Sequence, residues 1–287
     1  GSTGVLRDEL GVLPPGDVRQ CLVALSDSPK IRDLFNYRFE EGTFGGHSFG
    51  NILLTALEKA TGNFSEAVET ASEILRVNGT VIPATLDNVR LKMEWPDASL
   101  TLHGERVIDA DYFKNDPRLA YLSLEPKASA NPLALKAIEQ ADLVVLAPGD
   151  LYTSLGALLA IDGIADALES TAAPIVYVSN LVTKRGQTEG FSVSDHANEI
   201  ERLVGAPVLD YVLYNQQMPS AELAKRYEEV EGSYAVAVDT ANLEEAHYQA
   251  YAGEFLSSDI QPAHDTDMLP VTRSLIRHDA DAVASAI

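Results

Sequence analysis

The sequence predicts an α/β fold built on a mostly parallel sheet, with a small β insertion. From about residue 143 the chain alternates strand and helix signals, which is the pattern of a parallel sheet with helices on its faces. The run Leu143–Ala147 is continuously apolar and ends at Pro148 and Gly149, as expected of a strand buried on both sides. Short strand signals at about residues 80–110 are separated by turn residues and indicate a small antiparallel subdomain. The sequence contains no internal repeat and no low-complexity linker, so we expect residues 1–287 to form a single domain.

The first quarter of the chain is predicted to be helical, because helix signals follow one another there with few strand signals between them. We expect these helices to cover one face or edge of the sheet. They are expected near residues 17–25, 48–59 and 65–75. The short strands of the β insertion are expected at residues 81–82, 89–95 and 100–102.

The second half of the chain is predicted to supply the sheet and its flanking helices. A helix is expected over residues 153–169, with a break at Asp162–Gly163. A second helix is expected over residues 192–204, where Ser192 and Asp195 form a start that resembles a capping box. Residues 254–287 carry only weak helix signals. The strands are expected at residues 143–147, 174–179, 210–214 and 234–238.

Composition argues against several classes of partner. A formal charge of -22 would repel a nucleic-acid backbone, and no cluster of Lys and Arg interrupts it. No stretch approaches the roughly 20 apolar residues of a membrane span, and Gly1–Leu10 lacks the features of a signal peptide. We therefore expect a cytoplasmic protein with neither a nucleic acid nor a membrane as partner. The lone cysteine, Cys21, lies in an apolar run and is expected to be a buried structural thiol.

Three loops are candidates for holding an anionic ligand, because open parallel sheets bind ligands where strand-end loops lead into helix N-termini. Ala147–Ser154 combines a glycine with hydroxyl groups, and Ser179–Gly190 carries an amide, hydroxyls and two cations. Gly45–Asn51 places glycines before a helix. The alternatives for the first two are a turn capped by Thr153 or Ser154 and an ordinary solvated connection.

Two other chemistries have weaker support. Gly46–Gly50 fits the G-x-S-x-G elbow of serine hydrolases, with Ser48 as nucleophile, but the elbow must follow a buried strand and residues 39–43 are polar. His264–Asp267 is as well explained by a surface turn as by a metal site. Asp17 is a reasonable carboxylate for a divalent ion that bridges ligand phosphates, with helix capping as the alternative.

An ordered series of motifs resembles the CofD/YvcK family, and in particular its YvcK-type members, known as gluconeogenesis factors or morphogenesis factors. The series covers nearly the whole chain, which makes it more specific than any single motif. In chain order the motifs are Gly1–Arg7, Pro14–Leu25, Gly46–Asn51, Pro83–Val89, Pro148–Ser154, Ser179–Thr183, Gly186–Phe191, Ser194–His196 and Ile276–Asp279.

The resemblance implies a Rossmann-like three-layer sandwich. In the YvcK branch it implies a regulator that binds UDP-N-acetylglucosamine (UDP-GlcNAc) and is linked to gluconeogenic growth, cell shape and peptidoglycan synthesis, with no catalytic residue. Gly46–Ser48 and Pro14–Asp17 are more similar to this branch, so we expect a non-catalytic binding protein. The alternative is a CofD-like 2-phospho-L-lactate transferase that uses a guanylyl-activated donor. A third possibility is a partner-binding protein that has lost its ligand.

The loops and the resemblance together give a set of expected ligand contacts. Tyr227 and Arg277 enter the set through the resemblance, the arginine as a phosphate or sugar clamp, with helix packing and a surface ion pair as alternatives. No cofactor is expected to be required, although a divalent cation such as Mg²⁺ could accompany the nucleotide. A homo-oligomer and a cell-wall synthesis protein stay open as partners. The expected ligand-binding residues are Gly1, Ser2, Asp17, Gly46, His47, Ser48, Asn51, Gly149, Tyr152, Thr153, Ser154, Asn180, Thr183, Gly186, Thr188, Tyr227 and Arg277.

The sequence departs from the family pattern in two places. The numbering begins at Gly1-Ser2-Thr3-Gly4, whereas the family pattern places a strand and a Gly-rich loop before this point. Either the protein lacks that piece or its residues lie outside this numbering, and only a protein that truly lacks them would lose central strands of the sheet. Asp150 stands where the family usually has a small hydroxyl residue. A carboxylate beside a phosphate would repel it unless a cation lies between them.

Overall fold

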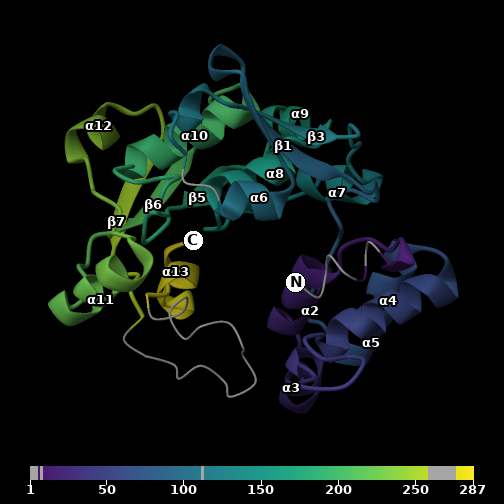
Figure 1. The fold of residues 1–287 in the computed structure, drawn as a ribbon. Coiled ribbons are helices and arrows are strands. Elements are labelled where there is room, and N and C mark those ends of the chain that lie inside the picture. Colours follow the sequence, from purple (N-terminus) through teal and green to yellow (C-terminus); the bar gives the residue numbers. More distant parts are fainter. Residues whose placement is uncertain (1–5, 7–8, 111–112, 258–275) are drawn as a thin grey trace. The chain divides into compact units, whose positions relative to one another are not determined.

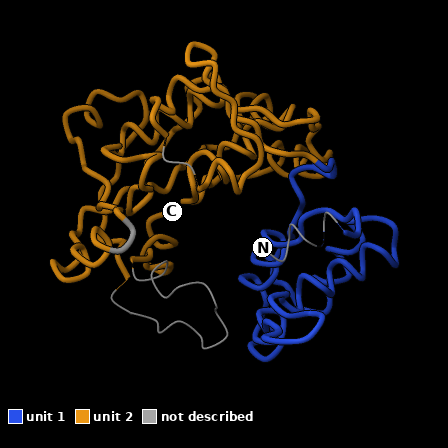
Figure 2. The backbone as a smooth tube through the Cα atoms, in the orientation of Figure 1, with its two compact units in different colours: residues 1–88, 263–270 blue, residues 89–262, 271–287 orange. Residues whose placement is uncertain are grey.

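The structure is a computed structural model that describes residues 6, 9–110, 113–257 and 276–287. The chain divides into two compact units, which Figure 2 shows in different colours. Unit 1 comprises residues 1–88 and 263–270, and unit 2 comprises residues 89–262 and 271–287.

Unit 1 is built from helices packed around one apolar core. Its buried centre includes Leu22, Phe35, Leu54 and Leu75, each fully buried, so the driving force for this unit is apolar burial. The three helices predicted here are confirmed, and a short additional helix follows the first of them. The helices are α2 (Gly16–Ala24), α3 (Pro29–Asn36), α4 (Phe49–Thr61) and α5 (Phe64–Leu75).

Cys21 does not behave as predicted. Its side chain is exposed on α2, because the buried face of this short helix is taken by Leu22. The pKa of the thiol is nevertheless raised, first by partial burial and then by the nearby carboxylate of Asp17. The expectation of a buried structural thiol is therefore wrong.

The β insertion forms a three-stranded antiparallel sheet at the start of unit 2. Its central strand, β1 (Arg90–Trp95), buries every second side chain, which is the period of a sheet with one packed face. β2 (Leu100–His103) and β3 (Tyr121–Glu125) pair with its two edges. The insertion is confirmed, but residues 81–82 are not a strand and the third strand lies beyond the expected range. The short helices of this region are η1 (Pro96–Ala98), α6 (Glu105–Ala110) and η2 (Pro117–Leu119).

The main sheet is four-stranded in the described part of the chain and wholly parallel, which confirms the predicted α/β class. In spatial order its strands are β4 (Val144–Leu146), β5 (Ile175–Val178), β6 (Tyr211–Asn215) and β7 (Gln249–Gly253). All four residues of β5 are buried, as an inner strand requires. On β4, by contrast, Val145 is 41% exposed, so the expectation of a strand buried on both sides is wrong. Among the described strands, β4 lies at the edge of the sheet.

Residues 234–238 do not form the predicted strand. Ala235 makes only an isolated bridge to Val182, and Ala237 makes one to Ser192. This segment pairs with the chain that follows β5 instead of joining the sheet. The fourth strand is β7, which was not predicted.

Helices flank the parallel sheet, and Figure 1 shows α10 and α13 on opposite sides of it. Ala282 and Val283 of α13 pack on a buried cluster that contains Val176, Val178 and Leu213 of the strands. The predicted break near Asp162–Gly163 is present, and Ser192 with Asp195 forms a true capping box at the start of α10. The helices are α7 (Pro132–Glu139), the π-helical turn η3 (Leu151–Leu155), α8 (Gly156–Leu159), α9 (Ile164–Ser170), α10 (Val193–Val204), α11 (Ala221–Glu231), α12 (Thr240–Glu245) and α13 (Ala280–Ala286).

None of the helices among the described residues is long and apolar enough to cross a lipid bilayer.

Candidate functional site

The loops that leave β4 and β5 meet at one edge of the sheet. Parallel strands end on the same side, so residues 147–154 and 179–190 both start from this edge. The side-chain N–H of Asn180 donates a hydrogen bond to the carbonyl of Gly149 over 2.8 Å, which ties the two loops together. The amide oxygen of Asn180 in turn accepts a 2.7 Å hydrogen bond from the hydroxyl of Tyr177. Because Tyr177 is fully buried in β5, the Asn180 side chain is held in one orientation.

Charged side chains from three distant segments gather beside this junction. The ammonium group of Lys184 donates to Asp150 Oδ2 over 2.7 Å and to the carboxylate of Asp109. Thr153 Oγ1 lies 3.4 Å from Asp109 Oδ1 as a donor to the same carboxylate. Asp109 comes from α6, which follows the small antiparallel sheet and packs against η3. Asp150, the residue that departs from the family pattern, therefore has a cation beside it.

Buried hydroxyl groups hold the loop after β5 in shape. Thr188 Oγ1 accepts a 2.8 Å hydrogen bond from the backbone N–H of Lys184, and Thr183 exchanges hydrogen bonds with the backbone of Tyr234. Both threonines are only 3% exposed. Gly186, at φ 72°, accepts from the N–H of Phe113 over 2.8 Å. Of the predicted contacts in this loop, Thr183 and Thr188 thus shape the backbone, and Asn180 and Gly186 lie nearer the surface.

The loop after β4 has a buried part and an exposed part. Tyr152 is fully buried, with its ring 6.0 Å from that of Phe113 in an edge arrangement, and burial raises the pKa of its hydroxyl. Thr153 is 7% exposed. Gly149 is half-buried and Ser154 is exposed, so these two present the loop to solvent.

The C-terminal segment also reaches the end of β5. His278 Nε2 lies 3.1 Å from the carbonyl oxygen of Ser179, and burial lowers the pKa of this imidazole. Tyr227, on α11 and 4% exposed, accepts a 3.0 Å hydrogen bond from the N–H of Ile276. Arg277 lies in the sequence between Ile276 and His278, which these two contacts anchor, and its side chain is exposed. The two aromatic anchors thus place a guanidinium on a segment that contacts the loop after β5.

The residues predicted in unit 1 lie at the starts of two helices. Asp17 is exposed in the first turn of α2. Gly46 has φ 81°, His47 is half-buried, and Asn51 is 4% exposed in the first turn of α4. Ser48 is the N-cap of α4, and its hydroxyl accepts a 3.3 Å hydrogen bond from the N–H of Asn51. Gly1 and Ser2 lie outside the described residues.

The hydrolase alternative finds no support in the geometry of Ser48. This serine is 1% exposed and follows an irregular segment, in which Arg38 and Ser48 form only an isolated bridge. A nucleophile elbow needs a serine presented at the top of a buried strand. Ser48 instead caps a helix.

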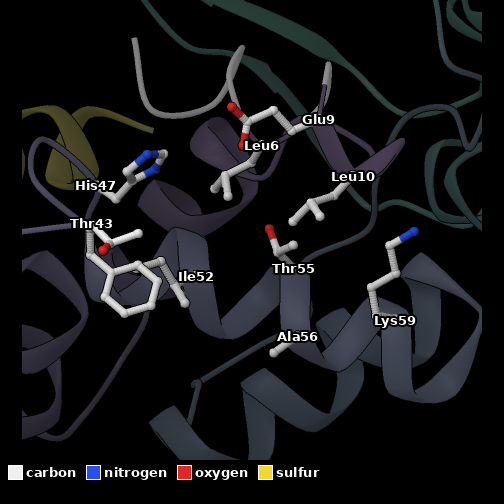
Figure 3. A pocket seen from close by; sticks show the side chains of 10 residues that line it. Leu6, Glu9, Leu10, Thr43, His47, Ile52, Thr55, Ala56 and Lys59 are labelled. Carbon is white, nitrogen blue, oxygen red and sulfur yellow. The ribbon is translucent and has the colours of Figure 1, made fainter.

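A pocket of about 300 Å³ opens in unit 1 beside α4 (Figure 3). Its walls are mainly apolar, and the polar side chains at its rim include His47 and Lys59. Thr55, 5% exposed, also lines it. The lining residues are Leu6, Glu9, Leu10, Thr43, Phe44, His47, Ile52, Thr55, Ala56 and Lys59.

The described residues contain no group of three or more His, Cys, Asp or Glu side chains placed to hold a metal ion. Asp17, suggested as a carboxylate for a divalent ion, is therefore not part of such a group within the part of the chain that the structure describes.

Sequence reasoning missed the two side chains that complete the charged cluster. Lys184 was visible only as one of two cations in a polar loop. Asp109 carried no signal at all, because it lies 75 residues from Lys184 and belongs to the insertion.

Comparison with known proteins gives a consistent result. Residues 1–256 match the family model described as 2-phospho-L-lactate transferase CofD. A protein of Thermotoga maritima, provisionally named as a gluconeogenesis factor, is 38% identical over 289 residues, covering 100% of this chain and 86% of its own length. The Listeria monocytogenes protein named gluconeogenesis factor is 34% identical over 290 residues, covering 100% of this chain and 83% of its own length.

A Clostridium acetobutylicum relative, also provisionally named as a gluconeogenesis factor, is 38% identical over 289 residues, and the chain spans 61% of its length. Among solved structures, a member of the UPF0052 family from Bacillus halodurans superimposes with a TM-score of 0.88 at 33% identity. That match covers 100% of this chain and 87% of the other.

Proposed function

Because this chain belongs to the CofD family, we propose that it is a nucleotide-sugar-binding regulatory protein whose ligand is UDP-N-acetylglucosamine. The names of its relatives favour a role in gluconeogenic growth, and we extend the proposal to cell shape and peptidoglycan synthesis, for which a UDP-linked amino sugar is a natural signal. Within the cell we place this role in the cytoplasm. A homo-oligomer and a protein of cell-wall synthesis are the partners that we propose to test.

The observation that carries the proposal is the Asn180–Gly149 hydrogen bond at the carboxyl edge of the parallel sheet. It brings together the two loops that the sequence marks for phosphate and sugar recognition. Ligands of open α/β sheets bind at this edge, where backbone N–H groups and a few polar side chains converge.

The chemistry around this junction suits a sugar diphosphate. Gly149 allows a close approach to the backbone, and the exposed hydroxyl of Ser154 offers a hydrogen bond to a phosphate oxygen. Arg277, next to His278 at the end of β5, supplies a guanidinium that can pair with phosphate in a two-pronged manner. A chain with a formal charge of -22 needs such local donors to bind an anion.

Isothermal titration calorimetry with UDP-N-acetylglucosamine tests the proposal on the whole chain. We expect saturable binding that weakens by about tenfold in Arg277→Ala, since a charged hydrogen bond to phosphate is lost. Lys225→Ala is the matched control, because Lys225 is an exposed cation on α11 whose partner Glu229 is 3.7 Å away. If millimolar ligand produces no heat of binding and no thermal shift, the proposal is defeated.

The second candidate is phospholactyl transfer, which the description of the matched family model favours. Incubation with a guanylyl-activated phospholactate and a deazaflavin acceptor, followed by mass spectrometry, decides between the two. We expect no phospholactyl product, since no catalytic group is assigned. Product formation above the rate without protein would replace the regulatory proposal.

A further inference from the structure

The carboxylates of Asp109 and Asp150 are arranged as if around a cation. Both accept hydrogen bonds from one atom, Lys184 Nζ, so their oxygens flank a single point beside the loop after β4. Mg²⁺ in nucleotide sites is commonly held by one or two carboxylates together with the phosphates of the ligand. In this chain the ammonium group of Lys184 occupies the point where that ion would lie.

We propose that Lys184 takes the place of a divalent cation, so that the chain binds the diphosphate of its ligand without Mg²⁺. The inference rests on the proposed function and adds to it the residue that offsets the charge of the two carboxylates beside the diphosphate.

The position of the Lys184 ammonium group is fixed from several sides. The backbone N–H of Lys184 is bound to Thr188 Oγ1 at 2.8 Å, and the preceding residue, Thr183, exchanges hydrogen bonds with Tyr234. At the other end, Asp109 also accepts from Thr153 Oγ1 at 3.4 Å. A lysine on a flexible stem costs entropy to immobilise, and these contacts reduce that cost before any ligand arrives.

Partial burial makes this charge effective. The side chain of Lys184 is 23% exposed, against 30% for Asp109 and 43% for Asp150. Charges that are partly removed from water are screened less than those on the open surface. Without the ammonium group, two carboxylates would face the phosphates and repel them.

The test is calorimetry with UDP-N-acetylglucosamine in two buffers, one with EDTA and one with Mg²⁺. The wild-type dissociation constant should be the same in both within about twofold. Lys184→Gln should weaken binding in EDTA by about tenfold or more, because the two carboxylates lose their cation. Mg²⁺ should restore most of that loss, and the rescue should disappear in Asp150→Ser/Lys184→Gln, which removes one of the two ion ligands.

Lys225→Gln is the matched control, because it removes the same charge from an exposed pair on α11 and should leave the affinity unchanged in both buffers. Thermal unfolding followed by circular dichroism checks that each variant is folded. A wild type that loses its affinity in EDTA overturns the inference. So does a Lys184→Gln variant that binds like the wild type in EDTA, or one whose deficit Mg²⁺ does not reduce.

A second measurement does not depend on the nucleotide, so the inference and the proposed function can fail separately. In a titration with Mn²⁺ followed by electron paramagnetic resonance, Lys184→Gln should gain a bound ion that the wild type and the double variant lack. Equal Mn²⁺ binding by all three proteins overturns the inference. Absence of nucleotide binding by the wild type defeats the proposed function instead.

Discussion

The loops that follow β4 and β5 and the loop that precedes α4 carry a similar sequence signal, yet they are held together differently. Around the Gly149 loop, side-chain hydrogen bonds join residues that lie 31 to 75 positions apart in the sequence, such as Asn180 with Gly149 and Lys184 with Asp109. Around Gly46, the bonds are local: its N–H donates to the carbonyl of Phe39, and its own carbonyl accepts from Arg38. Glycine and hydroxyl residues before a helix can therefore mark either a long-range polar junction or a self-contained helix start.

The largest effect is expected where the local packing of unit 1 is tightest. A Cβ atom on Gly50 would lie 2.8 Å from the carbonyl oxygen of Phe35 and 2.9 Å from Phe35 Cδ1, so Gly50→Ala must push α4 from α3. We expect a loss of about 3 kcal/mol in the free energy of unfolding, measured by urea denaturation. Gly46→Ala is the comparison. A Cβ atom on Gly46 would have no other atom within 4 Å, so the substitution costs only the backbone strain of a non-glycine residue at φ 81°, about 1 kcal/mol. Equal stability of Gly50→Ala and the wild type would contradict this packing.

The long-range junction of unit 2 should respond nearly as strongly. Asn180→Ala leaves the buried hydroxyl of Tyr177 without the amide oxygen that accepts from it and separates the two loops. The expected cost is about 2 kcal/mol in urea denaturation, together with weaker binding of UDP-N-acetylglucosamine. Asn242→Ala removes an exposed amide that donates to Asp239 Oδ2 over 2.9 Å and should cost less than about 0.5 kcal/mol. If both variants cost the same, the junction is not a buried network.

A smaller effect is expected at the start of α4. Ser48→Ala removes the hydroxyl that accepts from the N–H of Asn51, and an N-cap of this kind contributes about 1 kcal/mol. Ser220→Ala, which removes the cap of α11 on an exposed surface, gives the reference value. Thermal unfolding measures both. A hydrolase would instead lose esterase turnover in Ser48→Ala with its stability intact, which would break the assignment of Ser48 as a cap.

The smallest predicted effect is a dependence of stability on pH in unit 2. Burial lowers the pKa of His278 and of His196, so both imidazoles are neutral in the folded protein over a range where the unfolded chain takes up protons. Stability should therefore fall as pH drops below about 6.5, the ordinary pKa of histidine. Asp116 and Asp239 have carboxyl groups with a lowered pKa, and their contribution to stability is lost only as pH falls below about 4.

Urea midpoints between pH 5 and pH 7.5 measure this dependence. His278→Gln should reduce the slope, because one of the two imidazoles with a lowered pKa is then absent. A slope that is unchanged in His278→Gln would show that the contact with Ser179 carries no part of it.

The same contrast between local and long-range bonds explains what the sequence could predict. α4 and α10 were predicted well, because each N-cap serine forms its hydrogen bond with a residue only three positions further along the chain. β5 and β6 were predicted from their apolar runs, which an inner parallel strand requires. The segment 234–238 has a similar run, but its partners lie in the loop after β5, and no local pattern distinguishes a bridge to a loop from a place in the sheet.

The candidate site was predictable only in part, for the same physical reason. The position of the two loops followed from the ends of β4 and β5, and their glycine and amide residues were recognisable. The charged cluster was not, because Asp109 reaches it through the path of α6, a property of the tertiary fold. Tyr152 and Thr183 show the converse limit: their residue types suit a ligand, and the structure buries them.

Hydrogen–deuterium exchange with and without UDP-N-acetylglucosamine tests the central claim most directly, because it locates the ligand on the chain. If the carboxyl edge of the parallel sheet binds the nucleotide-sugar, amides within residues 147–154 and 179–190 should exchange more slowly when the ligand is present. A ligand that protects only other segments of the chain, or none, would contradict the account.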